Sequence, residues 1–262
     1  MKVASWNVNS IRARQGRALA WLERQRPDVA CLQETKILDD EFPAEAFRAM
    51  GYESAFFGQK SYNGVAILSL HPMEDVRRGL TGPVSDDARV LSARIQGVRI
   101  VSVYVPNGES LQSDKYAFKL RFYAALTGQV AQSVQAGGER EPLLLCGDFN
   151  VAPEARDVYD AGVFENDVMF HVAARHALKG LFDLGLVDTY RLHHPEPGAY
   201  SWWDYRMLGF PKNRGARIDH ILATPDLAAR CRSSVIDREE RKGKLPSDHA
   251  PVIAEFDLGA PP

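Results

Sequence analysis

The sequence predicts an α/β fold in which two mixed sheets pack together and helices cover them. Short apolar, β-branched runs recur along the chain, and each ends in a polar or turn residue, which is typical of buried strands. The helical patterns are too few to alternate with so many strands, which argues against a doubly wound parallel sheet. No linker rich in Pro, Gly or Ser divides the 262 residues. We therefore predict a single domain over residues 1–262.

The expected elements follow from periodicity. The predicted strands are VASWN (3–7), DVACLQE (28–34), GVAILS (64–69), VRIVSVYV (98–105), PLLLCGDF (142–149), RIDHILA (217–223) and PVIAEF (251–256). Helical spacing of apolar residues predicts three helices. Their apolar faces are Phe42, Ala46, Phe47 and Met50 in 41–50, Tyr116, Leu120, Tyr123, Val130 and Val134 in 115–136, and Leu178, Leu181 and Phe182. Residues 135–141 are predicted to form a surface turn, and 259–262 a frayed end.

The composition is that of a globular protein, with 45% hydrophobic and 25% charged residues. The 32 basic and 34 acidic side chains nearly balance, which argues against a protein that coats DNA non-specifically, although a local basic rim can still steer DNA. Cys31, Cys146 and Cys231 are odd in number and widely spaced, so neither a disulfide framework nor a zinc site is expected. With no apolar run of membrane-spanning length and no signal-peptide pattern, we expect a cytoplasmic protein.

Polar residues stand at the ends of the predicted strands. They are Asn7, Glu34, Asp148, Asn150, Asp219, Asp248 and His249. Because strands that end at one edge can bring their terminal side chains into one cleft, we expect these residues to converge. Carboxylate and amide oxygens suit Mg²⁺ or Mn²⁺, whereas zinc prefers more His or Cys. A cation held by carboxylates is the usual tool of phosphate chemistry, since it neutralises charge on the phosphoryl group.

Two of these groups indicate specific chemistry. The period of two in a strand puts Asp148 and Asn150 on the same side, where they can deprotonate and orient a water molecule. An acid beside His249 favours the imidazolium, which stabilises charge on a phosphate oxygen. Asp248 needs an irregular backbone to be that acid, because neighbouring strand residues point apart, so Asp219 is the other candidate. Taken alone, each candidate also has an ordinary explanation. Glu34 is then a surface residue, the segment around Asp148 an Asx turn, and Asp248-His249 part of an inert loop.

Together the pieces resemble the exonuclease–endonuclease–phosphatase superfamily, and within it the exodeoxyribonuclease III branch, from about Lys2 to Phe256. The matching stretches are SWNVNSIRAR, PDVACLQETK, GYESAFFGQKSYNGVAIL, VYVPNGES, KLRFY, LLLCGDFNVAP, GLVDTYR, YSWWDYR, NRGARIDHIL and PSDHAPV. The resemblance implies a four-layered α/β sandwich with its site at one edge of the two sheets. It also implies a Mg²⁺-dependent DNA-repair phosphodiesterase, with Mn²⁺ as a substitute, that cuts 5′ to abasic sites and acts on 3′ ends as an exonuclease and 3′-phosphatase.

Carried over residue by residue, the resemblance implies roles in the site. The implied metal ligands are Asn7 and Glu34, with Asp148, Asn150, Asp248 and His249. In catalysis, Tyr104 and His249 are implied to contact the phosphate, and Asp248 to orient His249. Asp148 is implied to activate the attacking water, and Asn150 to orient it. Asp219 is implied to bind metal or to assist the leaving group.

The substrate side rests on the same resemblance. Trp202 is implied to form an aromatic wall around the extruded abasic sugar, because a shaped apolar pocket admits a sugar that lacks its base. Trp203 is expected in the core. The residues expected at the DNA-facing rim are Lys36, Arg89, Arg206, Lys212 and Arg214. Ala216 is smaller than the residue of many relatives and is expected to loosen the pocket. The segment 165–178 departs from the family pattern, and its His171 and His176 either lie on the surface or touch substrate.

The expected partner is duplex DNA with abasic sites or blocked 3′ ends, bound by a monomer away from any membrane. A second hypothesis keeps the fold and changes the substrate to undamaged DNA or a small phosphoester, since fold does not determine function. A third is a DNA-binding or regulatory protein with a dead site. The YSWWDYR segment favours the repair nuclease, and the complete set of polar residues argues against a dead site.

Overall fold

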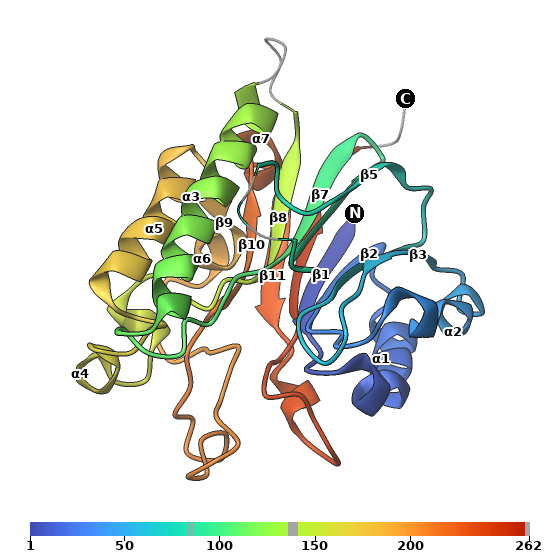
Figure 1. The fold of residues 1–262 in the computed structure, drawn as a ribbon. Coiled ribbons are helices and arrows are strands. Elements are labelled where there is room, and N and C mark those ends of the chain that lie inside the picture. Colours follow the sequence, from blue (N-terminus) through green and yellow to red (C-terminus); the bar gives the residue numbers. More distant parts are fainter. Residues whose placement is uncertain (83, 85, 136–140, 260–262) are drawn as a thin grey trace.

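The computed structural model describes residues 1–82, 84, 86–135 and 141–259, and within them two six-stranded sheets face each other with helices outside (Figure 1). The first sheet has the order β11-β12-β1-β2-β4-β3. Its strands are β11 (Cys231–Ile236), β12 (Val252–Phe256), β1 (Lys2–Asn7), β2 (Val29–Gln33), β4 (Val65–Ser69) and β3 (Glu53–Phe57). The second has the order β5-β6-β7-β8-β10-β9. Its strands are β5 (Glu74–Arg78), β6 (Val90–Ile95), β7 (Val98–Tyr104), β8 (Leu143–Asp148), β10 (Asp219–Ala223) and β9 (Val187–Asp188).

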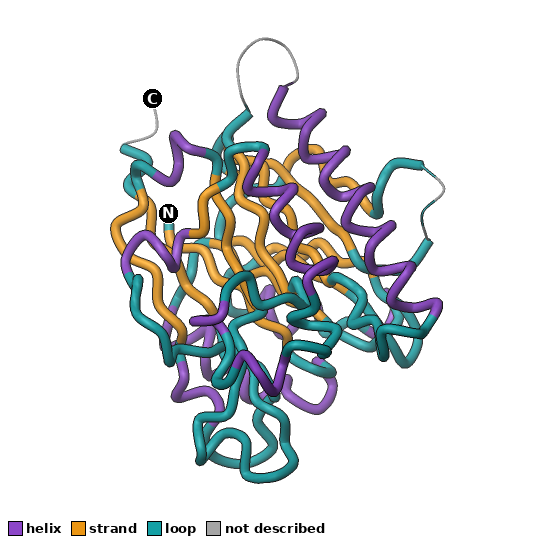
Figure 2. The backbone as a smooth tube through the Cα atoms, turned by 90° about the vertical axis from the view of Figure 1, so that its left-hand side faces the viewer, coloured by secondary structure: helices purple, strands orange, loops and turns teal. Residues whose placement is uncertain are grey.

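Helices cover the outer face of each sheet, which completes four layers. The α-helices are α1 (Ile11–Gln25), α2 (Ala44–Arg48), α3 (Asp114–Gln135), α4 (Ala161–Phe164), α5 (Val172–Asp183), α6 (Thr189–His193) and α7 (Pro225–Ala228). Short 3₁₀ turns are η1 (Asp39–Glu41), η2 (Ala155–Asp157) and η3 (Arg238–Arg241). Figure 1 shows α1 and α2 on the side of the first sheet and α3 and α5 on the side of the second, and Figure 2 looks onto the second set. The predicted fold class is confirmed.

Both faces of each sheet are buried, which explains why the strands are continuous apolar runs. In β8, Leu143 and Leu145 pack under α3 and α5, whereas Leu144 and Cys146 point between the sheets. In β2, the residues Ala30 and Leu32 pack under α1, whereas Val29 and Cys31 point between the sheets. The alternation follows from the period of two in a strand. Three buried layers of side chains therefore hold the four layers of backbone together.

The strand directions bring the polar strand ends to one edge. β1 runs parallel to β2 and β7 runs parallel to β8, so these four strands end at the same edge of their sheets. β12 is antiparallel to β1 and β10 is antiparallel to β8, so these two strands begin there. Long loops without regular structure, including parts of 195–215 and 238–248, gather at this edge, at the lower end of Figures 1 and 2.

All seven predicted strands are present; β1 begins one residue earlier than predicted, and the other six are shorter by one or two residues. The predicted helix 115–136 is α3, and the third predicted helix is part of α5. The prediction for 41–50 was too long, because α2 covers only Ala44–Arg48 and Phe42 ends the preceding 3₁₀ turn. The predicted turn at 135–141 and frayed end at 259–262 fall mainly on positions outside the described residues.

The structure adds elements that the periodicity did not reveal. The longest of them is α1, which begins after the N-cap Ser10 and buries Ile11, Ala18, Trp21 and Leu22. These residues lie at helical spacing, but three arginines and a glycine among them dilute the apolar signal. The strand β5, EDVRR, is exposed along its whole length at a sheet edge, so no apolar run marked it.

Candidate active site

The predicted polar residues meet at this edge, around the carboxylate of Asp148. Asn7, the last residue of β1, donates from Nδ2 to Glu34 Oε1 at 2.7 Å and to Asp148 Oδ2 at 2.9 Å. His249 Nε2 lies 3.7 Å from the same Asp148 oxygen. Three potential ligand atoms, one from each of Glu34, Asp148 and His249, lie within 4.8 Å of one another. Residues separated by up to 242 positions thus form one cluster, as the strand ends predicted.

Asn150 is held rigidly beside Asp148. Its backbone N–H donates to Asp148 Oδ1 at 2.8 Å, and its Nδ2 donates to Val105 O at 2.9 Å and lies 3.3 Å from Asp148 Oδ2. Its Oδ1 accepts from Asn107 Nδ2 at 3.1 Å. Asn150 has a φ of 50°, in the left-handed region that non-glycine residues seldom occupy. Asparagine adopts this region more readily than most residues, and these hydrogen bonds hold Asn150 in it.

His249 is clamped between two carboxylates. Its Nδ1 lies 2.9 and 3.1 Å from the oxygens of Asp219, on the side opposite Asp148. Burial by itself lowers the pKa of His249, but the charges of Asp219 and Asp148 outweigh it and raise this pKa to about 10. His249 is therefore an imidazolium at neutral pH, with Nδ1–H donated to Asp219 and Nε2–H directed towards Asp148.

The same surroundings raise the pKa of Asp148. It is 1% exposed, and burial raises its pKa to about 7, against the lowering effect of the His249 charge and with further raising by Asp219 and Glu34. Tyr104 ends β7 beside the same acids. Burial and the charges of Glu34 and Asp148 hold the pKa of Tyr104 well above its usual value, so its phenol stays protonated.

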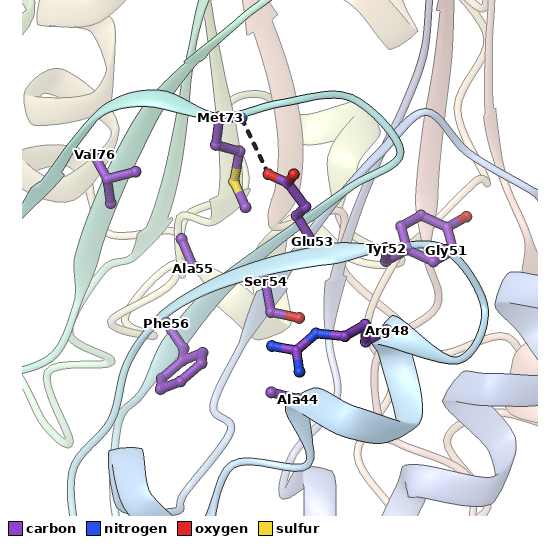
Figure 3. A pocket seen from close by; sticks show the side chains of 10 residues that line it. All are labelled: Ala44, Arg48, Gly51, Tyr52, Glu53, Ser54, Ala55, Phe56, Met73 and Val76. Atoms are coloured by element: carbon purple, nitrogen blue, oxygen red, sulfur yellow. Dashed lines mark hydrogen bonds between the residues drawn. The ribbon is translucent and has the colours of Figure 1, made fainter.

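A basic rim borders the acids on one side. Lys36 Nζ lies 2.7 Å from Glu34 Oε2 and donates to Asn9 Oδ1 at 2.6 Å. The guanidinium of Arg89 lies 4.8 Å from the centroid of the Tyr104 ring. These residues line a cavity of about 610 Å³ together with Tyr62 and Asn107. Another cavity, of about 700 Å³, lies between α2, β3 and β5 (Figure 3), but none of the predicted site residues lines it.

The structure corrects the expected partner of His249. The resemblance implied that Asp248 orients it, but the ring nitrogen of His249 bonds to Asp219. Asp248 instead accepts from Trp202 Nε1 at 3.1 Å and from Asn9 Nδ2 at 2.9 Å. Neighbouring residues point apart, so Asp248 faces the Trp202 side while His249 faces Asp148. Burial raises the pKa of Asp248, but the His249 charge and these two hydrogen bonds bring it below its usual value.

Asn7 has a defined orientation between the backbone and the two carboxylates. Its Oδ1 accepts from the backbone N–H of Asn9 at 2.9 Å, which determines the orientation of the amide. The Nδ2 group therefore faces Glu34 and Asp148. Asn7 orients the two carboxylates and offers its oxygen to the backbone.

The prediction that Ala216 faces substrate is corrected by the structure. It is fully buried in the core and its backbone bridges Val158 and Trp202, so its side chain does not border open space. Arg206 lies apart from the acids on an exposed loop, where it pairs with Asp204 at 2.7 Å. Trp202 is partly buried and bridges His249, whereas Trp203 is fully buried, as expected.

The two histidines of the departing segment have separate environments. His171 caps α5, and its Nδ1 lies 2.8 Å from the hydroxyl of Tyr116. His176 lines a cavity of about 440 Å³ beside Phe182. Arg214 lies over the Tyr159 ring, at 6.0 Å from its centroid. None of these three residues joins the cluster around Asp148.

Four polar residues to which the sequence reasoning gave no role support the cluster. They are Asn9, Asn107, Ser201 and Ser247. Ser201 Oγ accepts from the backbone N–H groups of Ile218 and Asp219 at 3.0 Å each, and Ser247 Oγ donates to Asn7 O at 2.7 Å. Asn9 carried a signal, because it stands two residues after Asn7, in the same spacing that marked Asp148 and Asn150. The other three depend on contacts between distant segments.

Known proteins are similar to this chain over nearly its whole length. The profile of the Endonuclease/Exonuclease/phosphatase family matches residues 4–249. The chain is 35% identical to exodeoxyribonuclease III of Haemophilus influenzae over 98% of this chain and all of that one. It is 30% identical to the DNA repair nuclease APEX1 of Danio rerio, over 96% of this chain and 81% of that one.

Solved structures are similar over nearly the whole chain. An AP endonuclease from Archaeoglobus fulgidus has a TM-score of 0.95 at 41% identity, and the match covers 98% of this chain and all of that one. The 3′ phosphatase NExo from Neisseria, bound to a product DNA hairpin, has a TM-score of 0.95 at 42% identity with the same coverage. The resemblance read from the sequence is confirmed.

Proposed function

The chain belongs to the Endonuclease/Exonuclease/phosphatase family, and on that premise we propose that it is a DNA-repair phosphodiesterase. It hydrolyses the DNA backbone 5′ to abasic sites and acts on 3′ ends as a 3′–5′ exonuclease and 3′-phosphatase. Relatives named exodeoxyribonuclease III, AP endonuclease and 3′ phosphatase support these three activities. Its membership of the family and these relatives make the chain a nuclease, that is, a hydrolase that acts on DNA.

The observation that carries the proposal is the pairing of a buried carboxylate with a buried imidazolium. Asp148 lies 3.7 Å from His249 Nε2 and is hydrogen-bonded by Asn7 and Asn150. Hydrogen bonds hold this carboxylate in a fixed position, as general-base catalysis requires. We assign it the proton of the attacking water, with Asn150 orienting that water.

The same cluster offers donors to a phosphate group. His249 is kept protonated by Asp219 and donates from Nε2, which stabilises negative charge that develops on a phosphate oxygen. Tyr104 remains a neutral phenol and is a second donor. As an imidazolium, His249 is a donor only, and we assign it a contact to phosphate.

The acids fit a hard divalent cation. Glu34 and Asp148 supply oxygens within 4.8 Å of each other, and burial of Asp148 among other acids raises its pKa, a cost that a cation between them relieves. We propose that these two residues hold Mg²⁺, or Mn²⁺ in its place. The chemistry that the bound cation supplies is neutralisation of charge on the phosphoryl group. Lys36, which pairs with Glu34, moves aside or onto DNA phosphate.

Selectivity for an abasic sugar is assigned to Trp202. Its indole N–H is held by Asp248 and its backbone bridges His249, so the ring has a determined place beside the phosphate donors. An aromatic wall at that place favours a sugar without a base over a normal nucleotide. Lys36 and Arg89 border the acids on the other side and are assigned contacts to the DNA backbone.

The setting of the enzyme is also proposed. We infer a monomer with a single domain over residues 1–262 that works in the cytoplasm. Cys31, Cys146 and Cys231 are all free thiols, which agrees with a reducing compartment. Among the described residues, none of the helices combines the length and the apolar character needed to cross a bilayer.

The test of the function compares three duplexes, one with a single abasic site, one with a blunt 3′ end and one with a 3′ phosphate. Purified protein is expected to act on all three in Mg²⁺ and on none after chelation. Gel analysis of the products gives the ranking of the three rates. Metal-dependent hydrolysis of a small phosphoester without incision of the abasic duplex contradicts the proposal and supports the alternative substrate class.

Metal binding is expected to weaken as the pH falls through about 7. Below this value Asp148 holds a proton that the cation must displace, and above it the carboxylate is already ionised. The affinity for Mn²⁺ should therefore be about tenfold lower at pH 6 than at pH 8. Thermal melting against Mn²⁺ concentration at both pH values measures the difference. Asp148→Asn is the control, expected to show little stabilisation at either pH, and equal affinity of the wild type at both values contradicts the assignment.

A further inference from the structure

A lysine without exposed surface lies behind the candidate site. Lys119, in the middle of α3, is 0% exposed. Its Nζ donates to Asn107 O at 3.0 Å, to Asn150 O at 2.8 Å and to Val168 O at 2.7 Å. An ammonium has three donors, and here each finds a backbone carbonyl. Because an ammonium is costly to bury even when it is hydrogen-bonded, a structural or functional role is expected for this lysine.

The three carbonyls belong to segments that are far apart in the chain. Asn107 lies in the loop after β7, Asn150 follows β8, and Val168 precedes α5. Lys119 is the common point at which the three segments are joined. Burial lowers the pKa of Lys119 to about 7, against the raising effect of the Asp148 and Asp167 charges.

Two of these carbonyls control the position of Asn150. One is its own, and the other belongs to Asn107, whose Nδ2 donates to Asn150 Oδ1. Asn150 in turn gives its backbone N–H to Asp148 Oδ1, and it has a left-handed φ of 50°. Lys119 therefore holds both the residue that orients the water and the neighbour that fixes its amide oxygen.

We propose that Lys119 is a positioning residue for hydrolysis, which keeps Asn150 and the Asp148 carboxylate aligned with the attacking water. The inference rests on the role that the proposed function gives to Asn150. Lys119 touches neither substrate nor metal, so its loss should change the rate of the chemical step and leave substrate binding intact. A misplacement of about 1 Å at the reacting group can lower a rate about 100-fold.

The test replaces Lys119 with Met, which has a similar shape and no donors. The matched control is Tyr123→Phe, one turn further along α3. Tyr123 is fully buried and its hydroxyl donates to Phe149 O at 2.6 Å, so the control also removes a buried hydrogen bond to a carbonyl beside the site. Lys119→Met is expected to lower kcat on the abasic duplex about 10- to 100-fold with KM changed less than about twofold. Tyr123→Phe is expected to lower the melting temperature with kcat within about threefold of wild type.

A double-mutant cycle with Asn150→Ala tests whether Lys119 acts through Asn150. If Lys119 acts through Asn150, Lys119→Met adds little further loss once Asn150 is removed. Losses that multiply overturn the inference, as does wild-type kcat in Lys119→Met when Asn150→Ala has lost activity. Full activity of Asn150→Ala is a different result, because it overturns the role of Asn150 in the proposed function itself.

A second variant covers the case in which Lys119→Met does not fold. Lys119→Gln keeps an uncharged group with two donors. It is expected to have a kcat between those of wild type and Lys119→Met, with KM unchanged. A rise in KM with unchanged kcat overturns the inference, since it assigns Lys119 to binding.

Discussion

Asp148→Asn is expected to lower kcat for incision of an abasic duplex by about a thousandfold or more. An amide cannot accept the proton of the attacking water, and it removes one of the two acids that would hold the cation. The backbone N–H of Asn150 can still donate to the amide oxygen at this position, so the local structure should persist. Steady-state kinetics on the abasic duplex, with thermal melting of the same samples, measures both effects.

The stability of this variant has an expected sign. The pKa of Asp148 is raised to about 7 in the folded protein, so its contribution to the free energy of unfolding is present at low pH and is lost as the pH rises through 7. Without metal at pH 8, Asp148→Asn should therefore be at least as stable as wild type. Asp183→Asn, an exposed acid paired with Lys179 on α5, is the control and should keep wild-type kcat. An Asp148→Asn protein with a kcat near wild type contradicts the assignment of the base.

Asp219→Asn is expected to lower kcat about 100- to 1,000-fold, as for the loss of one donor to a developing charge. Burial lowers the pKa of His249, and the charge of Asp219 contributes most among the three carboxylates that raise it to about 10. Without this carboxylate, His249 loses its proton at a lower pH. The decline of kcat on the alkaline side should move to lower pH by more than one unit, and a pH profile of kcat between pH 6 and 10 measures the shift.

The comparison variant for this experiment is Asp248→Asn. Asp248 is adjacent to His249 in the chain, but its carboxylate is bonded to Trp202 and Asn9. Its replacement should leave the alkaline decline much closer to that of wild type. Equal shifts in the two variants, or a larger one in Asp248→Asn, means that the neighbour in the chain and not Asp219 sets the charge of His249.

The sequence was informative wherever local spacing had a structural consequence. The buried strands were recognisable because both sheet faces are covered, which makes runs such as LLLCG apolar at every position. The polar strand ends predicted a shared site because Asn7, Glu34 and Asp148 each stand at the end of a strand that points to the same edge. The order of the motifs identified the family, which the comparisons confirm.

The tertiary structure alone decided which polar groups become partners. The sequence left Asp219 and Asp248 as alternative partners of His249, because a ring reaches either acid depending on how β10 and β12 are placed. The burial of Ala216 and of Lys119 was equally hidden, since both depend on packing between segments that no local pattern connects. Spacing along a chain determines which side of an element a residue faces, but hydrogen bonds between distant segments depend on the assembled layers, and those bonds set the charges on which the proposed chemistry rests.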